Sequence, residues 1–221
     1  MDGPFRGMLL DPDVESGTLM PRVLGTYESE LWPAMRELLA LADRPVVLNV
    51  GAADGYYAIG LLYGNLARRV VAYETLPRLQ DAIARMAKRN GVEGQLVVRG
   101  QCTQAELGAA LRECRPDLLL LDVEGGEAEL LVPDRVPELK SIHILVELHP
   151  WVAEEEQSAI LTAFSSTHVL SIVRARTPSA EDIRNAFFRG VAGLSTGVEL
   201  RLLGERSAAT YWCCMRSIMT A

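Results

Sequence analysis

The stretch that decides the fold lies at residues 46–60 and reads VVLNVGAADGYYAIG. It begins as an apolar run rich in β-branched residues, which is typical of a strand buried on both faces. Two glycines, Gly51 and Gly55, then interrupt the apolar run, and a helix-like pattern begins at Tyr56. A strand, a tight glycine turn and a helix N-terminus together form a socket for an anionic or nucleoside-bearing ligand, because the backbone can approach such a ligand and the helix amides point at it.

The spacing of the two glycines narrows the kind of ligand. A dinucleotide-binding turn reads G-x-G-x-x-G, and the order from Gly51 to Gly55 does not fit it. The turn resembles motif I of class I S-adenosylmethionine (SAM)-dependent methyltransferases, in which an acidic or amide residue is followed closely by G-x-x-x-G. The other interpretation is a tight turn in an unrelated α/β domain. The resemblance implies that the turn lies under the methionine half of SAM, with cofactor contacts from Asn49, Gly51, Ala52, Asp54, Gly55 and Tyr56.

Length, charge and hydropathy limit the class of protein. The chain has 221 residues, which is enough for one α/β domain with a full core. Its 29 acidic residues outnumber 22 Lys and Arg, which gives a formal charge of -7, and we see no basic run that would bind a phosphate backbone. No apolar run reaches the length of about 18 residues that a membrane span needs. We therefore expect a small-molecule partner rather than nucleic acid or a membrane, and we leave a homodimer open.

The N-terminus and the cysteines indicate the compartment. Asp2, Asp11 and Asp13 stand where a signal peptide would be basic and then apolar. The four cysteines form no C-x-x-C pair, so we expect reduced, mostly buried thiols in a cytoplasmic protein. Cys213 and Cys214 are adjacent and should point to opposite faces of a strand.

Residues 1–44 are predicted to form a leader ahead of a SAM-binding domain at 45–221. Residues 1–26 are expected to be irregular because glycines and prolines punctuate them. A helix follows, capped by Thr26 or by Ser29, and Pro33 favours the later start since proline is tolerated only in a first turn. Two roles are open for this leader: a lid across the mouth of the socket, or a helix that only covers a face of the sheet.

Beyond residue 44, apolar strand patterns alternate with helical ones. Such alternation predicts a parallel sheet with helices on both faces. The expected strands are 45–50, 69–74, 95–99, 117–122, 141–148 and 169–174, and the expected helices are 56–64, 77–90, 103–114, 127–131 and 154–164.

The tail departs from this alternation. Glycines and a proline punctuate 177–197, which we interpret as an insertion on the substrate side. A last strand is expected at 211–217, and class I methyltransferases place such a strand antiparallel beside the sixth. The predicted fold is therefore α/β: a Rossmann-like, doubly wound, seven-stranded, mostly parallel sheet with an antiparallel last strand.

Polar residues gather at the carboxyl ends of the predicted strands, where open α/β sheets bind their ligands. Glu74 follows the second strand, roughly twenty residues past the glycine turn, and a carboxylate there can accept hydrogen bonds from both ribose hydroxyls. The other interpretation is a solvated glutamate at a strand end. Gln101 and Cys102 follow the third strand, where the methyltransferase family places its adenine contacts.

A run of carboxylates follows the fourth strand and reads Asp122-Val123-Glu124-Gly125-Gly126-Glu127. Carboxylates crowded at the end of a buried strand repel one another, so stability alone would not select them. The run D-V-E-G-x-E, with Glu147-Leu148-His149-Pro150 after it, resembles FkbM-type methyltransferases, which are class I enzymes credited with O-methylation of natural products or sugars. The chain departs from that family at Asn49 and at Ala53-Asp54, where an Asp and an Asn-Ile pair are common.

The FkbM resemblance implies roles for these strand ends. Asp122 would lie beside the transferred methyl group and hold the SAM amino group or orient a substrate hydroxyl, and Glu127 would complete a polar pocket or stabilise a helix start. His149 is the best general base, because an unperturbed pKa of about 6.5 suits proton transfer at neutral pH; a histidine that only caps the loop before Pro150 is the other interpretation. Candidates for the substrate side are Tyr27, Glu28, Tyr57, Glu124 and Glu147.

The sequence leaves open whether the site holds a metal ion and which reaction it catalyses. Asp122, Glu147 and His149 could hold a divalent ion, which we do not expect. The predicted activity is SAM-dependent methylation of a hydroxyl on a small molecule. The alternatives are an intramolecular displacement at the sulfonium that releases methylthioadenosine, a SAM-binding module without catalysis, and an NAD-dependent oxidoreductase, which the glycine spacing disfavours.

Overall fold

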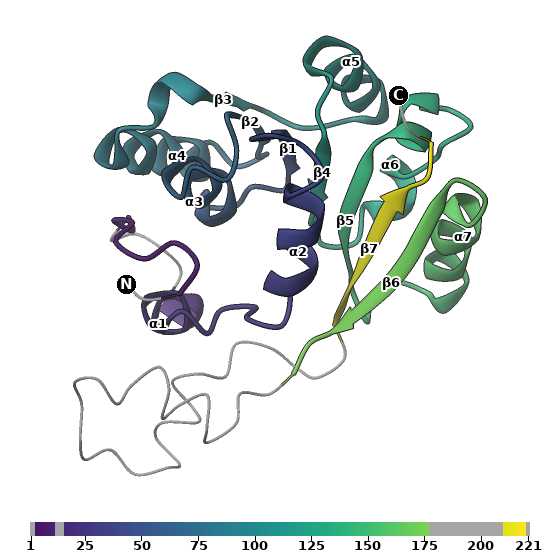
Figure 1. Cartoon of the computed structure of the whole chain (residues 1–221), viewed down its shortest axis with the longest axis horizontal. Helices are drawn as coiled ribbons and strands as arrows, with labels where there is room; N and C mark the ends of the chain where they lie inside the picture. Colours follow the sequence, from purple (N-terminus) through teal and green to yellow (C-terminus); the bar gives the residue numbers. More distant parts are fainter. Residues whose placement is uncertain (1–2, 12–15, 177–209, 220–221) are drawn as a thin grey trace.

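The described part of the chain forms seven strands, at Val46–Val50 (β1), Arg69–Tyr73 (β2), Leu96–Arg99 (β3), Leu118–Leu121 (β4), His143–Leu148 (β5), His168–Arg174 (β6) and Tyr211–Ser217 (β7). The computed structural model describes residues 3–11, 16–176 and 210–219. The strands make one sheet in the order β3-β2-β1-β4-β5-β7-β6 (Figure 1). Neighbours are parallel from β3 through β5, and β7 is antiparallel to both β5 and β6. The predicted Rossmann-like sheet with an antiparallel last strand is confirmed.

Five helices alternate with the strands as predicted. Their ends follow local signals: α4 begins at Pro77 and ends before Gly91, whose backbone is left-handed with φ 69°. At the start of α5, Thr103 and Glu106 form a reciprocal capping box. The helices are α3 (Tyr56–Tyr63), α4 (Pro77–Asn90), α5 (Gln104–Cys114), α6 (Glu127–Leu130) and α7 (Glu154–Phe164), and 3-10 turns lie at Glu93–Gln95 (η1) and Pro137–Ser141 (η2).

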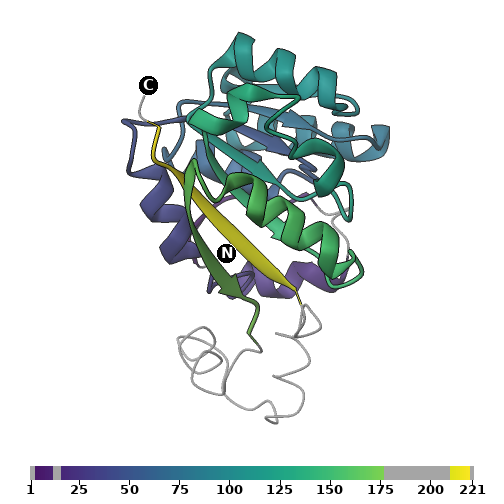
Figure 2. The same ribbon diagram turned by 90° about the vertical axis from the view of Figure 1, so that its right-hand side faces the viewer.

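The two faces of the sheet carry separate apolar clusters. Side chains alternate along a strand, so Leu118 and Leu120 of β4 face one cluster while Leu119 and Leu121 face the other. The first cluster lies under α3, α4 and a leader helix, α2 (Trp32–Leu39), and the second lies under α5, α6 and α7. Figure 2 shows α2 and α7 on opposite sides of the β6–β7 pair.

The beginning of the leader differs from the prediction. Residues 16–24, expected to be irregular, form helix α1 (Ser16–Leu24) with Pro21 inside it. The prediction was wrong because a proline in a helix interior is unfavourable locally, but long-range contacts override that preference. One such contact is the buried ion pair between Arg22 of α1 and Asp54.

The second leader helix starts closer to the later of the two predicted starts, but a few residues beyond it. Helix α2 begins at Trp32, with Leu31 as its N-cap and Pro33 in its first turn. Neither Thr26 nor Ser29 caps it, so the predicted caps were wrong. The Thr26 hydroxyl instead donates to the carbonyl oxygen of Pro21 at the end of α1.

The first described segment, residues 3–11, lies against α3 and α4. Phe5 contacts Gly60 of α3 so closely that a Cβ at this glycine would lie 2.2 Å from a ring carbon. The Asn90 side chain accepts a hydrogen bond from the Leu9 backbone N–H and donates one to the Leu9 carbonyl oxygen, each at 2.8 Å. The leader is therefore joined to the domain at several points, and its role as a lid stays a prediction.

The tail is described only in part. The insertion expected at 177–197 lies outside the described residues. Cys213 and Cys214 of β7 belong to opposite clusters, as predicted, and both are free thiols. None of the helices in the described ranges combines the length and the apolar character that crossing a bilayer requires.

Candidate active site

A cavity of about 750 Å³ opens at the carboxyl ends of strands β1 to β5. Its walls are formed by the residues that follow each of these strands and by residues of the leader. The volume lies within the range of about 300–1,000 Å³ that small-molecule sites occupy. The predicted site residues that line it are Tyr27, Gly51, Asp54, Glu74, Gln101, Cys102, Asp122, Glu124, Glu147 and His149.

The other predicted site residues lie elsewhere. Asn49 is buried within β1, and Ala52, Gly55 and Tyr56 are buried in the glycine turn and at the start of α3. Among the described residues, these four are not part of the cavity lining. Glu28 and Tyr57 are likewise absent from the lining, because the Tyr57 hydroxyl donates to the buried Glu28 carboxylate. Burial and the nearby Glu28 charge raise the pKa of Tyr57, which keeps the phenol protonated.

The glycine turn brings the ends of three strands together. Gly51 has φ 78°, and a Cβ at this position would lie 1.6 Å from the carbonyl oxygen of Asp122. The backbone N–H groups of Gly51 and Ala52 both donate to the carbonyl oxygen of Tyr73, at 3.0 and 2.9 Å. Only glycine fits this close approach between the ends of β1 and β4.

Glu74 is held by backbone N–H groups on both sides. Its Oε2 accepts a hydrogen bond from Ala53 N at 2.9 Å, and its Oε1 accepts one from Leu76 N at 2.9 Å. The carboxylate is thereby fixed next to the glycine turn. A carboxylate has about four acceptor sites, so Glu74 retains acceptor capacity toward the cavity that it lines.

Arg22 enters the cavity wall from the leader and was not among the predicted site residues. Its guanidinium pairs with the Asp54 carboxylate, and both side chains are buried. The guanidinium carbon also lies 4.8 and 4.9 Å from the ring centroids of Tyr27 and Tyr56. Asp54 stands where the resembled family has an apolar residue, and a buried carboxylate at that point was a signal for a cationic partner.

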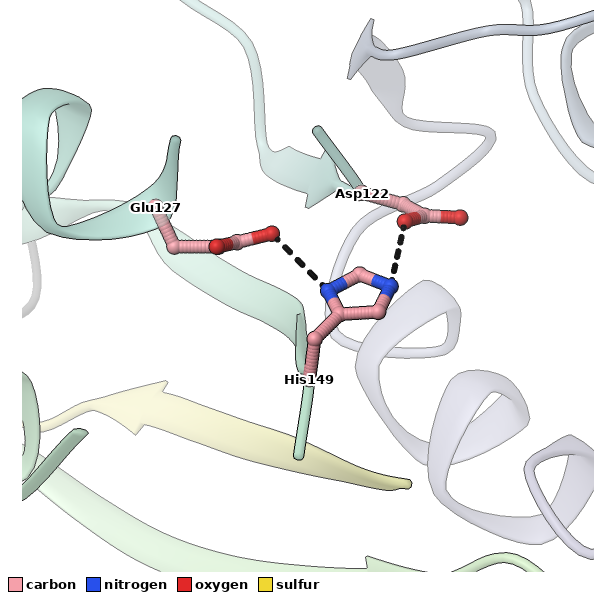
Figure 3. Close-up of side chains that lie close together, drawn as sticks. All are labelled: Asp122, Glu127 and His149. Carbon is pink, nitrogen blue, oxygen red and sulfur yellow. Dashed lines mark hydrogen bonds and ion pairs between the residues drawn. The ribbon is translucent and has the colours of Figure 1, made fainter. Parts of the chain in front are cut away.

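His149 lies at the centre of a cluster of carboxylates at the ends of β4 and β5. Its Nδ1 is 3.1 Å from Glu127 Oε1. Its Nε2 is 3.5 Å from Asp122 Oδ1, 3.3 Å from Glu124 Oε2 and 3.8 Å from Glu147 Oε1. Figure 3 shows Glu127 and Asp122 directed toward different nitrogens of the ring.

The cluster changes the pKa of its members. Burial by itself lowers the pKa of His149, but the hydrogen bond with Glu127 and the charges of Asp122, Glu124 and Glu127 outweigh it, so the pKa of His149 is raised. Burial by itself raises the pKa of Glu127, but its bonds with His149 and the backbone outweigh it, so the pKa of Glu127 is lowered. The protonated form of His149 is therefore stabilised above the usual pH range of an imidazole.

Trp151 is a second cavity residue that was not selected from the sequence. Its ring centroid lies 4.5 Å from that of His149, with the two planes 31° apart. The indole is 62% exposed, which is unusual for so large an apolar side chain. The sequence feature that could have selected Trp151 is its position two residues after His149, the predicted base, just past the end of β5.

Asp122, Glu127 and His149 also offer ligand atoms that lie within 4.8 Å of one another. A metal ion on an imidazole lies along the lone pair of one ring nitrogen. Because Glu127 faces Nδ1 and Asp122 faces Nε2, these three groups do not converge on one nitrogen (Figure 3). The predicted alternative set of Asp122, Glu147 and His149 stays a prediction.

Comparison with solved structures gives the fold. The chain matches the precorrin-6y C5,15-methyltransferase from Geobacter metallireducens with a TM-score of 0.57 at 14% identity, covering 97% of this chain and 95% of that one. It matches the O-methyltransferase from Bacillus cereus in complex with SAH with a TM-score of 0.52 at 13% identity, covering 93% and 94%. The chain has the fold of these methyltransferases. Cofactor-bound Rv0187 from MTB is similar as well, with a TM-score of 0.52 at 13% identity, covering 90% and 94%.

The sequence itself has no such counterpart, since no family model and no curated protein matches it. The FkbM-type resemblance is therefore not confirmed and stays a prediction. What the comparisons with solved structures show is the fold. The cavity of this chain lies at the carboxyl ends of its strands, where open α/β sheets bind their ligands.

Proposed function

We propose that this protein is a SAM-dependent methyltransferase that methylates a hydroxyl group on a small molecule. The observation that carries the proposal is that one cavity joins the glycine turn, Glu74 and the carboxylate cluster around His149. Its volume suits a nucleoside-bearing ligand together with a small acceptor. The similarity to solved methyltransferases supports the reaction class.

The residues that line the cavity fit the chemistry of SAM. Glu74 has acceptor sites for the two ribose hydroxyls beside those that bind the backbone. Asp122 and Glu147 complement the positive charges of the sulfonium and ammonium groups. Gln101 and Cys102 would lie beside the adenine; burial raises the pKa of Cys102 to about 12, which keeps a neutral thiol there.

The chain's own residues would position the acceptor and remove its proton. When bound, SAM supplies a methyl group on an electrophilic sulfonium. His149 Nε2 lies beside Asp122 and Glu124, which line the cavity. It would accept the proton of the acceptor hydroxyl as the new C–O bond forms and the bond between the methyl carbon and sulfur breaks. Asp122, 3.5 Å from that nitrogen, would orient the hydroxyl. Trp151 lies against one face of the imidazole and would restrict the access of water to it.

The leader would close the cavity as a lid. Arg22 and Tyr27 belong to the leader, and both line the cavity beside Asp54 of the glycine turn. If the leader only covered a face of the sheet, its side chains would contact that face and would not line the cavity. The leader would therefore exclude water from the methionine end of the cofactor.

The first experiment measures binding and products. Titration calorimetry of the purified protein with SAH should give a one-to-one isotherm, and titration with NAD should give none. Incubation with SAM and a panel of hydroxyl-bearing small molecules should release SAH, measured by mass spectrometry. Release of methylthioadenosine would indicate the intramolecular displacement, and binding of NAD without SAH would overturn the proposal.

Variants separate catalysis from binding alone. His149→Asn should lower kcat by about 10²- to 10⁴-fold, which is the contribution of a general base, with little change in the Kd for SAH. His143→Asn is the matched control, because His143 lies at the opposite end of β5 and accepts a hydrogen bond from the Ser217 backbone N–H. If the wild type and the variants all bind SAH but show no turnover with any acceptor, the protein is a SAM-binding module without catalysis.

Chelation tests the metal alternative. Because Glu127 and Asp122 face different nitrogens of His149, we expect EDTA-treated protein to keep its rate of SAH formation. Addition of Mg²⁺ or Mn²⁺ should not raise that rate. Loss of activity with EDTA and its recovery with either ion would instead make His149 a metal ligand.

A further inference from the structure

Glu127 is the least exposed member of the His149 cluster. It is the first residue of the short helix α6, and its side chain is 0% exposed. A helix-start glutamate is usually explained by the helix dipole or by capping. However, α6 spans only four residues and has no side-chain capping bond at its start. Its carboxylate turns instead toward β5 and meets His149 Nδ1 at 3.1 Å (Figure 3).

A tight turn before α6 fixes the direction of this carboxylate. Glu124 and Gly125 both have left-handed backbone, with φ 55° and 110°. This conformation directs the Gly125 N–H at Glu127 Oε1, which accepts it at 3.1 Å. The oxygen that faces His149 is therefore the one that the backbone holds in place, and the side chain cannot turn toward water because it is buried.

The surroundings of the ring decide where its proton lies when His149 is neutral. An ionised carboxylate can only accept hydrogen bonds, so Glu127 Oε1 favours a proton on Nδ1. The carboxylates near Nε2 compete less well. Asp122 Oδ1 lies 3.5 Å from Nε2, at the limit of hydrogen-bond distance, and the Glu124 side chain is 72% exposed, so water screens its charge. Glu147 is buried but its Oε1 lies 3.8 Å from Nε2, beyond hydrogen-bond distance.

The other two histidines have the opposite arrangement. His143 Nδ1 accepts a hydrogen bond from the Ser217 backbone N–H at 3.1 Å, so its proton must lie on Nε2. His168 Nε2 lies 2.8 Å from the carbonyl oxygen of Ile142, which can only accept, so its proton also lies on Nε2. The chain has three histidines, and His149 differs from both of the others.

We propose that Glu127 is a positioning residue for His149: it keeps the imidazole proton on Nδ1, so that Nε2 is left as the acceptor that faces the cavity. This inference rests on the proposed methyl transfer, in which the acceptor hydroxyl gives its proton to Nε2. In that step the hydroxyl proton moves to Nε2, and the proton on Nδ1 stays with Nδ1 and strengthens its bond to Glu127. Without Glu127, the carboxylates near Nε2 would draw the proton to that nitrogen and remove the acceptor.

The tautomer can be measured without any turnover. In ¹⁵N-labelled protein, long-range ¹H–¹⁵N correlations report which ring nitrogen of each histidine carries the proton. The spectra are recorded at a pH above the titration of His149, so that the ring is neutral. We expect His149 to carry its proton on Nδ1 and His143 and His168 to carry theirs on Nε2. A proton on Nε2 of His149 in the wild type would overturn the inference.

Two substitutions separate the hydrogen bond from the charge. In Glu127→Gln, the Gly125 N–H should hold the amide oxygen toward His149, so the Nδ1 tautomer is kept while the midpoint of the kcat–pH profile falls. In Glu127→Leu the acceptor is lost, and the tautomer should shift toward Nε2. We expect kcat of this variant to fall by about 10- to 100-fold, as for other partners that orient a functional histidine, with the KM for SAM unchanged within about twofold.

Matched controls keep the outcomes distinct. Glu155→Gln changes an exposed glutamate in the first turn of α7 and should leave the tautomer, kcat and the pH midpoint unchanged. If Glu127→Leu does not fold, the midpoint of Glu127→Gln still tests the inference, and an unchanged midpoint would contradict it. A wild-type Nδ1 tautomer in a protein that releases no SAH would leave Glu127 as a positioning residue and overturn the methyl transfer alone.

Discussion

Arg22 of the leader and Asp54 of the glycine turn form a buried ion pair in the wall of the cavity. The guanidinium also lies close to the rings of Tyr27 and Tyr56. Burial by itself lowers the pKa of Arg22, but Asp54 and Tyr27 outweigh it, so the pKa is raised and the guanidinium stays charged. The leader is therefore joined to the turn that we assign to the cofactor, although the two segments are far apart in the sequence.

Replacing one partner of this ion pair should lower the free energy of unfolding more than replacing both partners. Arg22→Met leaves the Asp54 carboxylate buried without its partner, and we expect it to lower the free energy of unfolding by about 3–5 kcal/mol. The double variant Arg22→Met/Asp54→Asn should recover part of that loss, because no charge is left buried. Urea unfolding followed by circular dichroism measures both. Arg112→Met, which removes an exposed pair with Glu138, should cost less than about 1 kcal/mol.

Glu74 should contribute to cofactor affinity through its charge. Glu74→Gln replaces one carboxylate oxygen by an NH₂ group, which cannot accept from Ala53 N or Leu76 N. Hydrogen bonds to a charged group are worth about 1.5–3 kcal/mol, so the Kd for SAH should rise by about 10- to 150-fold. Titration calorimetry tests this, with the exposed Glu93→Gln as a control of unchanged affinity. An unchanged Kd in Glu74→Gln would place the ribose elsewhere.

The rate of methyl transfer should increase with pH. His149 must be neutral to accept a proton, and its pKa is raised because the hydrogen bond with Glu127 and the charges of Asp122 and Glu124 outweigh burial. The kcat–pH profile should therefore reach its plateau at a higher pH than an ordinary imidazole of pKa about 6.5 would give. Glu124→Gln removes one of these charges and should move the midpoint to lower pH.

The same shift links stability to pH. Because the pKa of His149 is higher in the folded state than in the unfolded one, its protonation stabilises the fold fully below about pH 6.5. That contribution is lost as the pH rises through the raised pKa. In His149→Asn the free energy of unfolding should lack this dependence, which urea unfolding at a series of pH values would measure. A parallel pH dependence in both proteins would contradict the assignment.

Gly51 should tolerate no side chain. A Cβ there would meet the Asp122 carbonyl oxygen at 1.6 Å, and its φ of 78° is unfavourable for other residues. We expect Gly51→Ala to lower the free energy of unfolding by more than about 3 kcal/mol, since both backbone strain and a backbone clash act together. Gly94→Ala is the matched control, because a Cβ at Gly94 would have nothing within 4 Å. Equal stability of the two variants would contradict the close approach of β1 and β4.

Much of the fold was predictable because its signals are local. Helix α4 runs from Pro77 to Asn90 as predicted, since proline at the start and glycine past the end are conformational preferences of single residues. A strand was predicted at 117–122, and the four leucines of β4 lie in it, all buried and divided between the two clusters. Helix α1 was missed for the same reason, because its proline is a local signal against the helix that tertiary contacts override.

The sequence by itself determined the order of strands and helices, the glycine turn and the set of polar residues at the strand ends, because backbone conformation and side-chain periodicity act over a few residues. The tertiary structure alone decided which of those polar groups meet. It joined Arg22 to Asp54, Tyr57 to Glu28 and Glu127 to His149. A buried charge must be compensated by a partner that lies close to it in space. Which residue is that partner depends on distances across the folded chain, and spacing along the sequence does not give those distances.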